Sequence, residues 1–581
     1  MDTADLPTVA AVEPGNVDPQ QAPPPELTLR AVVAGGIIGA LVAAVNMYMG
    51  LKIAFTEGGA ILSAILCFAL IRGLGGRLSM LENNIGQTLA SGAASLGIMV
   101  SVIPALIMLG QPLGTFDTML WLFLVSALGV LFAIPLRKQF VVIDALPFPT
   151  GTACAATIRA MHARGEEALR QARTLGIAGI ISLLFTWFRD GAPKFVPEMT
   201  MAPFQLGGIP MARLAVGISW SPMLIGAGLL VGLRIGVSLL CGGILGWMAL
   251  GPVLFSSGVI ENPGMRTVSH WTMWLAIPLM VSAGFVTLLI RWRTIVGTFR
   301  SMKGARTGTS GGEVPFRLWA WGTLVVGLAT ALVMEWMLGI PFWMGMVAIL
   351  LSFLLAAVAV RAYGKTDVSP IGTMGHATQI LFGALAPGQM LPNVMTAGIT
   401  AGCANTAVDM MQDLKAGYLL GSTPWRQVVA QFIGVAIGTL IAVPVFSVLV
   451  AAYGLGTEAL PAPAAVIWSG MAELLSVGFS ALPPYGWIAV AAGAILGILL
   501  ALPVSGKWKR LLPSPLGIGI GLVIPVAYTS IIFLGAVAGA ILGKVAPIWS
   551  ENKMLYVASG LIAGEALLGV AIAVLRVAGV I

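Results

Sequence analysis

The stretch that decides the fold reads PNVMTAGITAGCANTAVDMMQDLKAGYLLGSTP and runs from Pro392 to Pro424. Long apolar segments of the kind that cross membranes lie on both sides of it. Asn405, Asp409 and Asp413 follow one another at intervals of four residues, so a helix would place them on one face. Ionisable groups at membrane depth are costly and usually face a water-filled path. The stretch predicts a polar site inside a membrane protein, although Asp413 and Lys415 would also suit a solvated helix end.

The composition of the whole chain excludes a soluble protein. Its 581 residues are 58% hydrophobic and only 9% charged, whereas soluble domains carry about 25% charged residues. We therefore predict an all-α, polytopic membrane protein. The net charge of +8 fits basic cytoplasmic loops and does not indicate nucleic-acid binding. The four cysteines show no paired spacing and the three histidines lie far apart, so we expect no disulfide framework, metal site or cofactor.

The apolar segments predict about 16 transmembrane helices, because each crossing needs about 20 apolar residues. We place them near 29–50, 53–71, 84–110, 117–136, 174–190, 215–234, 238–258, 271–290, 318–338, 341–360, 371–388, 393–412, 427–452, 486–504, 514–542 and 554–577. Two more apolar segments, 141–158 and 463–480, are interrupted by Pro, Gly or charge and are interpreted as re-entrant or partial helices.

Charge and proline content suggest how the chain is divided. Residues 1–26 form a Pro-rich, acidic segment that predicts a disordered cytoplasmic tail. A basic cytoplasmic linker at 291–317 would separate transmembrane halves at 27–290 and 318–581. With the N-terminus inside, most basic loops fall on the cytoplasmic side, and so does the C-terminus. The exceptions, which fall outside, are Arg189, Lys194, Arg213, Lys544 and Lys553.

A weak internal echo supports two related halves. LPFPTG at 146–151 resembles LPSPLG at 512–517, and each follows a basic patch and opens an apolar segment. Repeats are common in transporters, with the binding site at their interface. A good helix start, in which Pro suits the first turn, would explain the same letters.

Three further features carry polar groups into apolar surroundings. Asn83, Asn84, Gln87 and Thr88 begin a polar stripe that either lines a solute path or bonds neighbouring helices. Thr150, Gly151 and Thr152 stand where a helix N-terminus could meet a carboxylate, or where a helix is simply kinked. Glu565 lies near the middle of the last apolar run and should face inward, as a proton carrier or as a packing residue.

Motifs of other functional classes are absent from the sequence. Lys365 and Thr366 follow Gly364 as in a phosphate-binding loop, but Ala359 stands where the first glycine belongs. There is no HExxH and no GxSxG motif. An ATP-driven pump or an intramembrane hydrolase therefore has little support, and we expect no enzyme.

Six segments together resemble the oligopeptide transporter (OPT) family, in its bacterial and Yellow Stripe-like branch. They stand in the family's order across nearly the whole chain: NMYMGLK (46–52), ENNIGQTLASGAASL (82–96), LPFPTGTACAATIRAMH (146–162), TAGITAGCANTAVDMMQDLKAGYLLGSTPWRQ (396–427), LPSPLGIGIG (512–521) and ASGLIAGEALLGV (558–570). The KIPPR motif of the peptide-transporting branch is absent, and the NPG at 262–264 lacks its continuation. Peptides and other substrates therefore both stay open.

The resemblance implies an all-helical, proton-coupled secondary transporter that imports small peptides or metal–chelate complexes. It would be a multi-pass protein of the bacterial inner membrane, in contact with lipid, and a homodimer stays open. We predict alternating access, with proton coupling at Asp409 and Glu565. The substrate would be bound by Asn83, Asn84, Gln87, Thr88, Thr150, Gly151, Thr152, Asn405, Asp409, Gln412, Asp413 and Tyr418. An uncoupled channel or an exporter for small polar solutes is the alternative.

Overall fold

The structure is a computed structural model, and it describes residues 25–56, 59–163, 165–191, 194–262, 264–290, 296, 313–367, 370–502 and 512–580. Nearly all of this part of the chain is helical, which confirms the predicted all-α class. Residues 1–24 of the predicted tail and most of the predicted 291–317 linker lie outside these ranges. Glu26, at the end of that tail, is buried and accepts hydrogen bonds from the backbone and hydroxyl of Thr423.

The helices follow one another with short connections. Their bounds are α1 (Leu29–Ile53), α2 (Ala60–Gly73), α3 (Met80–Ala94), α4 (Val102–Met108), α5 (Thr115–Arg137), α6 (Pro149–Ala163), α7 (Gly165–Asp190), α8 (Pro222–Gly243), α9 (Gly251–Ser256), α10 (Met265–Ile290), α12 (Phe316–Leu338), α13 (Phe342–Thr366), α14 (Ile371–Leu385), α15 (Met390–Leu420), α16 (Pro424–Tyr453), α17 (Pro463–Val477), α18 (Gly486–Ala501), α20 (Pro515–Val523), α21 (Val526–Val545) and α22 (Pro547–Val577).

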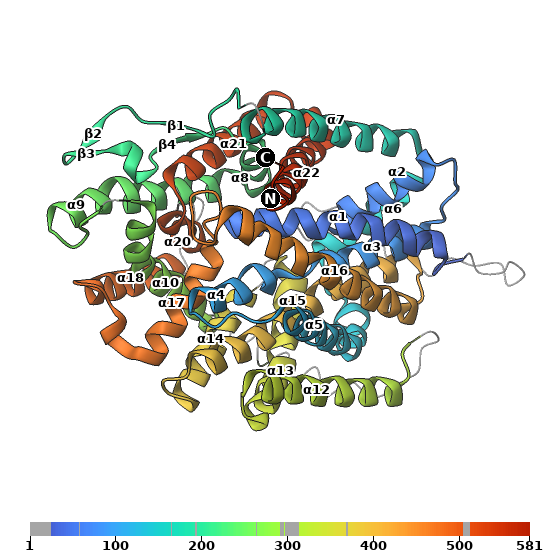
Figure 1. The fold of residues 1–581 in the computed structure, drawn as a ribbon. Coiled ribbons are helices and arrows are strands. Elements are labelled where there is room, and N and C mark those ends of the chain that lie inside the picture. Colours follow the sequence, from blue (N-terminus) through green and yellow to red (C-terminus); the bar gives the residue numbers. More distant parts are fainter. Residues whose placement is uncertain are drawn as a thin grey trace, which may run out of the picture.

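Short pieces of other structure join these helices. The 3-10 helices are Gly97–Val100, Met211–Leu214 and Gly478–Ala481, and the π-helical turns are Lys138–Ile143 and Ile244–Leu250. Between α7 and α8, β1 (Met199–Met201) pairs antiparallel with β4 (Gly217–Ser219), and β2 (Gln205–Leu206) pairs with β3 (Ile209–Pro210). These strands form a small flap at one end of the molecule (Figure 1).

Eleven helical stretches in the described part of the chain are long and apolar enough to cross a membrane. α15 is not among them, because polar residues interrupt it. α2 and α18 are apolar but short, and Pro463–Ala481, which the sequence suggested as a partial helix, passes the test. The structure thus supports a polytopic membrane protein, whereas the total of about 16 helices and the division into two related halves stay predictions.

The opening stretch of the sequence forms α15 at the centre of the helical body (Figure 1). From Pro392 to Gly417 every residue is fully buried except Asn405 and Asp409. Small residues allow this close packing: a Cβ on Gly398 or Gly402 would collide with Trp121 or Val125 of α5. α15 is therefore enclosed by protein along its length, with one partly open side at Asn405 and Asp409.

α8 turns back on itself at Gly232. Gly232 has φ 76° and ψ 168°, a conformation that favours glycine. Before it, Ile225 and Leu229 lie against Gly535 and Gly539 of α21, in rising order. After it, Gly236 lies against Ala536 and Gly243 against Thr529, in falling order. The two arms therefore run in opposite directions, as expected for separate helices at 215–234 and 238–258.

The segment predicted as one span at 514–542 is two helices that also run in opposite directions. The second arm of α8 packs parallel to α20, since Ser238 contacts Gly517 and Gly246 contacts Leu522. The same arm packs antiparallel to α21, as described above. The reversal lies at Ile524 and Pro525, where Pro525 has no N–H to continue a helix.

This reversal places the two ends of the chain on opposite faces. The starts of α1 and α3 lie together through Arg30 and Glu82, and the end of α6 joins them through His162 and the carbonyl of Leu78. α7 begins next to these ends. α22 then runs parallel to α7, because Gly560 contacts Leu175 and Gly564 contacts Ser182.

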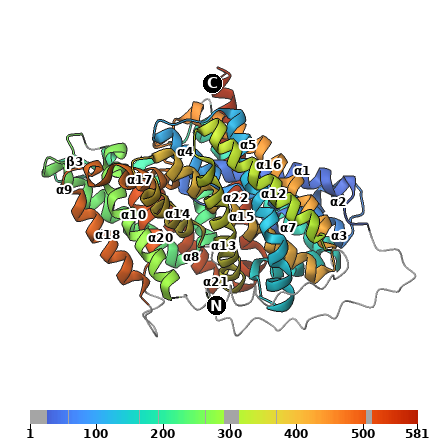
Figure 2. The ribbon, with the colours of Figure 1, turned by 90° about the horizontal axis from the view of Figure 1, so that it is seen from below.

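α22 consequently ends at the far face, and in Figure 2 the C-terminus lies at the upper edge of the molecule, away from α2 and α3. The expectation that both termini are cytoplasmic is therefore not supported. Its error was the treatment of 514–542 as a single crossing. The corrected path brings Lys544 and Lys553 to the face of the other basic segments, which improves the agreement with the positive-inside rule.

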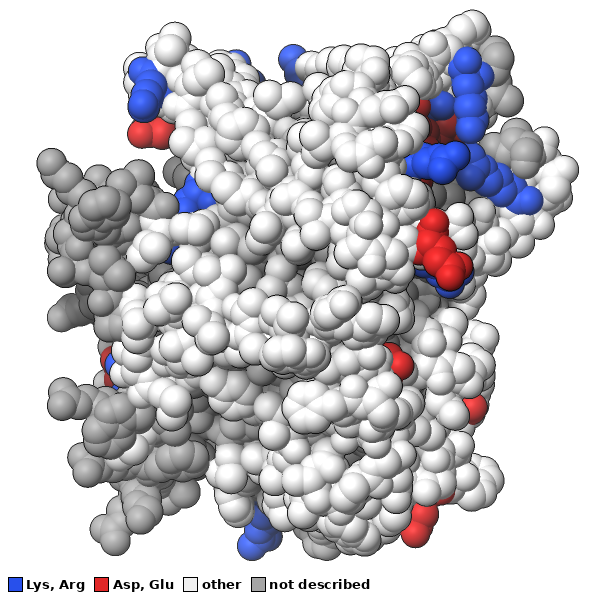
Figure 3. Space-filling view, turned by 90° about the vertical axis from the view of Figure 1, so that its left-hand side faces the viewer, with Lys and Arg blue, Asp and Glu red and all other residues white. Residues whose placement is uncertain are grey.

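The outer surface of the helical body is strongly apolar. α12 exposes Leu318, Trp321, Val325, Leu332 and Trp336 at helical spacing. Figure 3 shows one side of the molecule, on which Lys, Arg, Asp and Glu gather mainly toward the margins and leave the middle uncharged. An apolar belt of this kind suits contact with the hydrocarbon of a bilayer.

Candidate functional site

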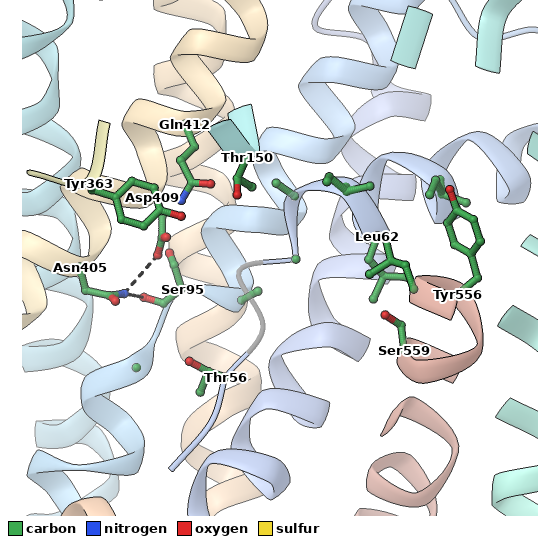
Figure 4. Close-up of a pocket in the computed structure, with 17 residues that line it drawn as sticks. Thr56, Leu62, Ser95, Thr150, Tyr363, Asn405, Asp409, Gln412, Tyr556 and Ser559 are labelled. Carbon is green, nitrogen blue, oxygen red and sulfur yellow. Dashed lines mark hydrogen bonds between the residues drawn. The ribbon is translucent and has the colours of Figure 1, made fainter. Parts of the chain in front are cut away.

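A cavity of about 340 Å³ lies beside the partly open side of α15 (Figure 4). Its volume falls in the range of small-molecule sites. Seven segments far apart in the sequence supply its walls. The lining residues are Thr56, Gly59, Ala60, Ile61, Leu62, Ile65, Ala94, Ser95, Gly97, Thr150, Tyr363, Asn405, Asp409, Gln412, Leu555, Tyr556 and Ser559.

The cavity forms where three helices are interrupted. α1 ends at Ile53, α2 begins at Ala60 and α3 ends at Ala94, all next to the lining residues. The backbone around Ala54 and Gly59 is left-handed and breaks the helical path. Irregular backbone inside a membrane protein is tolerated where it lines a cavity, and broken helices of this kind surround the substrate in many transporters.

Asp409 is the charged group of this cavity. Among the described lining residues it is the one carboxylate, and none is Lys, Arg or His. Asn405 donates from Nδ2 to the Asp409 carboxylate at 3.2 Å and to the carbonyl of Ser95 at 2.9 Å. Asn405 thereby ties α15 to the broken end of α3 and fixes the direction of the carboxylate. The cavity offers one anion surrounded by neutral hydrogen-bonding groups.

Of the twelve predicted substrate-binding residues, four line the cavity: Thr150, Asn405, Asp409 and Gln412. They come from two helices, α6 and α15. The sequence places Asn405, Asp409 and Gln412 on one helical face, and the structure brings that face to the cavity wall (Figure 4). Their role in binding a substrate stays a proposal.

The polar stripe of α3 lies between helices instead. Asn84 donates to the Ser422 hydroxyl at 3.0 Å, and Gln87 donates to the Asp413 carboxylate at 2.5 Å. Thr88 accepts a hydrogen bond from Gln427, and Asn83 is buried without a side-chain hydrogen bond in the described part of the chain. These contacts match the interhelical alternative that the sequence left open, although Ser95, at the end of α3, does line the cavity.

The other predicted residues also lie outside the cavity. Gly151 packs directly against the backbone of Gln412, and Thr152 donates to the carbonyl of Pro147 at 2.6 Å. Tyr418 is about half exposed at the end of α15, with the Arg137 guanidinium over its ring.

Glu565 lies in a second polar cluster, fully buried between four helices. Its carboxylate is 3.0 Å from Nη2 of Arg189 on α7 and 3.6 Å from Nζ of Lys52 on α1. The Ser221 hydroxyl donates to it at 2.8 Å, and so does the backbone N–H of Met223 at the start of α8. A helix N-terminus stabilises an anion, so every surrounding group favours the charged carboxylate.

The remaining charge in this cluster is balanced locally. Arg189 also forms a two-pronged ion pair with Asp190, at 2.7 and 2.5 Å. The Lys52 ammonium lies over the rings of Tyr48 and Tyr528. Two cations and two anions therefore balance within one buried cluster.

Several lining residues were not predicted as site residues from the sequence. Tyr363 stands at the end of an apolar helix, Thr56 lies in the break after α1, and Tyr556 and Ser559 lie near the start of α22. None belongs to a polar stripe. For Thr56, the signal that could have found it is the nearby Gly58-Gly59 pair, which marks a helix break.

The same arrangement is shared by a known family. The model of the family described as OPT oligopeptide transporter protein matches residues 26–576. The chain belongs to the OPT family. The resemblance found in its motifs is thereby confirmed, and the match covers both the cavity and the Glu565 cluster.

Individual OPT relatives align over most of their length. A protein of Haemophilus influenzae described as a putative oligopeptide transporter is 28% identical, over 92% of this chain and 93% of the relative. The metal-nicotianamine transporter YSL2 of Arabidopsis thaliana is 24% identical, over 95% and 94%. A probable metal-nicotianamine transporter of Oryza sativa is 27% identical, over 77% and 67%. Both branches of the OPT family, one described by peptides and the other by metal chelates, are thus similar to this chain.

Proposed function

We propose that this OPT protein imports small peptides or metal–chelate complexes together with protons, by alternating access around the cavity at α15. The observation that carries the proposal is the burial pattern of α15: between Pro392 and Gly417 only Asn405 and Asp409 are not fully buried, and both line the cavity. A carboxylate kept at membrane depth and open to a cavity is the arrangement expected for a solute path.

The cavity residues suit a substrate that carries a positive group. Asp409 would accept an ammonium or the positive region of a chelate. The amides of Asn405 and Gln412 would bond the neutral peptide or chelate groups around it. The peptide and metal-nicotianamine relatives both handle solutes of amino-acid type, which combine amines, carboxylates and amides. Asp413, which is buried against Gln87, would act indirectly by orienting the Asp409 face of α15.

Asp409 is also the group that would carry the coupled proton, because it is the carboxylate that the cavity reaches. For Glu565, the second residue predicted for this role, we propose a different one. Two cations, a hydroxyl and a backbone N–H hold its carboxylate, and it does not line the cavity.

The Glu565 cluster would close the cavity on one side. Lys52 stands four residues before Thr56, and Glu565 stands six residues after Ser559, so the ion pair links two walls of the cavity. Arg189 adds α7 to this link, and Ser221 adds the start of α8. Opening toward that side would require these contacts to separate.

We propose that the face holding the starts of α1, α3 and α22 is cytoplasmic, because most basic segments gather there. The C-terminus then lies on the outer side of the membrane. Proteolysis of tags at residues 1 and 581 in sealed, oriented vesicles tests this. The tags should become accessible from opposite sides, and simultaneous protection of both would contradict the orientation.

Uptake by the purified protein in liposomes tests the function itself. Labelled di- to tetrapeptides and iron or zinc complexes of nicotianamine are supplied outside, with an acidic or a matched external pH. We expect accumulation of at least one class under the pH gradient, with collapse on addition of a protonophore. Equilibration without accumulation would favour an uncoupled channel or exporter, and no uptake of either class would contradict the proposal.

A further inference from the structure

Asp367 is an acidic group at the outer side of the cavity wall that the proposed function leaves unused. It is the residue that directly follows α13, and its φ of 56° is left-handed. Residues with side chains seldom adopt this conformation, and Asp and Asn tolerate it best. Such local strain is found at functional sites when the surroundings hold it in place.

The start of α6 holds Asp367 in place. The Thr150 hydroxyl donates to Oδ2 of Asp367 at 2.7 Å, and the Thr150 backbone N–H approaches Oδ1 at 3.4 Å. The N-terminus of α6, which the sequence suggested as a carboxylate site, is therefore occupied by a carboxylate of the protein itself. Among the described residues, no Lys, Arg or His forms an ion pair with Asp367.

Tyr363 connects Asp367 to the cavity. It lies one helical turn before Asp367 on α13, and its hydroxyl hydrogen-bonds with both Asp367 and Thr150. Tyr363 and Thr150 are themselves lining residues of the cavity, together with Asp409. Figure 4 shows the Tyr363 ring beside Asp409. A phenol hydroxyl, which both donates and accepts hydrogen bonds, thus stands between two carboxylates.

We propose that Asp409, Tyr363 and Asp367 form a proton relay that connects the cavity with the membrane face at the end of α13. Protonated Asp409 gives its proton to the Tyr363 oxygen while the Tyr363 hydroxyl proton passes to Asp367. Asp409 is left as the carboxylate and Asp367 as the acid, with Tyr363 unchanged. This relay deepens the proposed function and rests on its proton coupling.

The surroundings of Asp367 fit the role of a proton acceptor. The titratable groups that face it are Tyr363 on its own helix and, across the cavity wall, Asp409 on α15, while α6 contributes the uncharged Thr150. The neighbouring acid Asp144 is bound to Arg361 at 3.0 Å and does not border the cavity. Asp367 is partly exposed, so it can exchange protons with water on that face.

Two substitutions separate the relay from a purely structural role. Asp367→Asn keeps an acceptor for Thr150 and a residue that tolerates the left-handed backbone, but it cannot take up the proton. Tyr363→Phe leaves the contacts between Thr150 and Asp367 intact and removes the hydroxyl. Asp144→Asn is the matched control, because it removes an acid on the same face that lies outside the relay.

The test compares two modes of transport in liposomes for each variant. Both relay variants should retain exchange of labelled for unlabelled substrate and lose accumulation driven by a pH gradient, with the pH profile of exchange shifted. Asp144→Asn should behave as the wild type does. Accumulation retained by Asp367→Asn and Tyr363→Phe would overturn the relay while leaving the proposed function intact. A wild type that is itself uncoupled would overturn both.

Discussion

Replacement of Glu565 by Gln is expected to destabilise the folded protein strongly. Glu565 is the shared partner of Lys52 and Arg189, and all three side chains are buried. Gln would leave two buried cations with Asp190 as their one remaining anion in the cluster. Breaking a buried ion pair on one side typically costs about 3–5 kcal/mol. Thermal unfolding of the purified protein should therefore show a markedly lower midpoint temperature.

The same helix supplies the control for this measurement. Glu551 is exposed near the start of α22, so Glu551→Gln should leave the midpoint almost unchanged. A double variant, Lys52→Met with Glu565→Met, removes one charge of each sign and should be more stable than Glu565→Gln alone. Equal midpoints for Glu565→Gln and the wild type would show that the cluster does not hold these helices together.

Replacement of Asp409 by Asn is expected to remove the preference for a positively charged substrate. Asp409 is the one carboxylate among the described lining residues, and no lining cation competes for it. A hydrogen bond to a charged group contributes about 1.5–3 kcal/mol, which corresponds to roughly tenfold or more in Kd. Asn keeps the size of the side chain and loses the charge. Titration calorimetry with a transported peptide should show this loss of affinity.

The peptide itself provides the control for Asp409. An N-acetylated form has the same backbone and no ammonium group. The wild type should bind the free amine more tightly than the acetylated form, and Asp409→Asn should bind the two about equally. If the variant kept the full preference for the free amine, Asp409 could not be the group that recognises it.

The sequence was sufficient for the membrane class and for the polar face of α15. Helical spacing placed Asn405, Asp409 and Gln412 on one face, and composition showed that the chain around them is apolar. Spacing could not distinguish Asp413, one turn further on, which turns toward Gln87 of α3. A helix has neighbours on all sides, and the sequence does not say which of them leaves a gap.

Contacts between distant segments were beyond reach of the sequence. Glu565 was expected to face inward, but its partner Arg189 was assigned to an outer loop, and 376 positions separate the two. The reversal at Pro525 was missed because a short break in an apolar run looks the same in a kinked helix and in a hairpin. That single turn changed the side on which the C-terminus lies.

The central claim is that the transported solute occupies the cavity at Asp409, and site-directed labelling tests it most directly. Cys241 is exposed, whereas Cys67, Cys154 and Cys403 are buried, so a Cys241→Ser background removes the exposed thiol of the described chain. Ser95→Cys then places a thiol in the cavity wall, and Ser126→Cys, buried on α5, is the control. We expect a small membrane-permeant thiol reagent to modify Ser95→Cys and to block uptake, with saturating substrate slowing the reaction and Ser126→Cys unaffected. Full modification of Ser95→Cys with unchanged uptake and no protection by substrate would contradict the account.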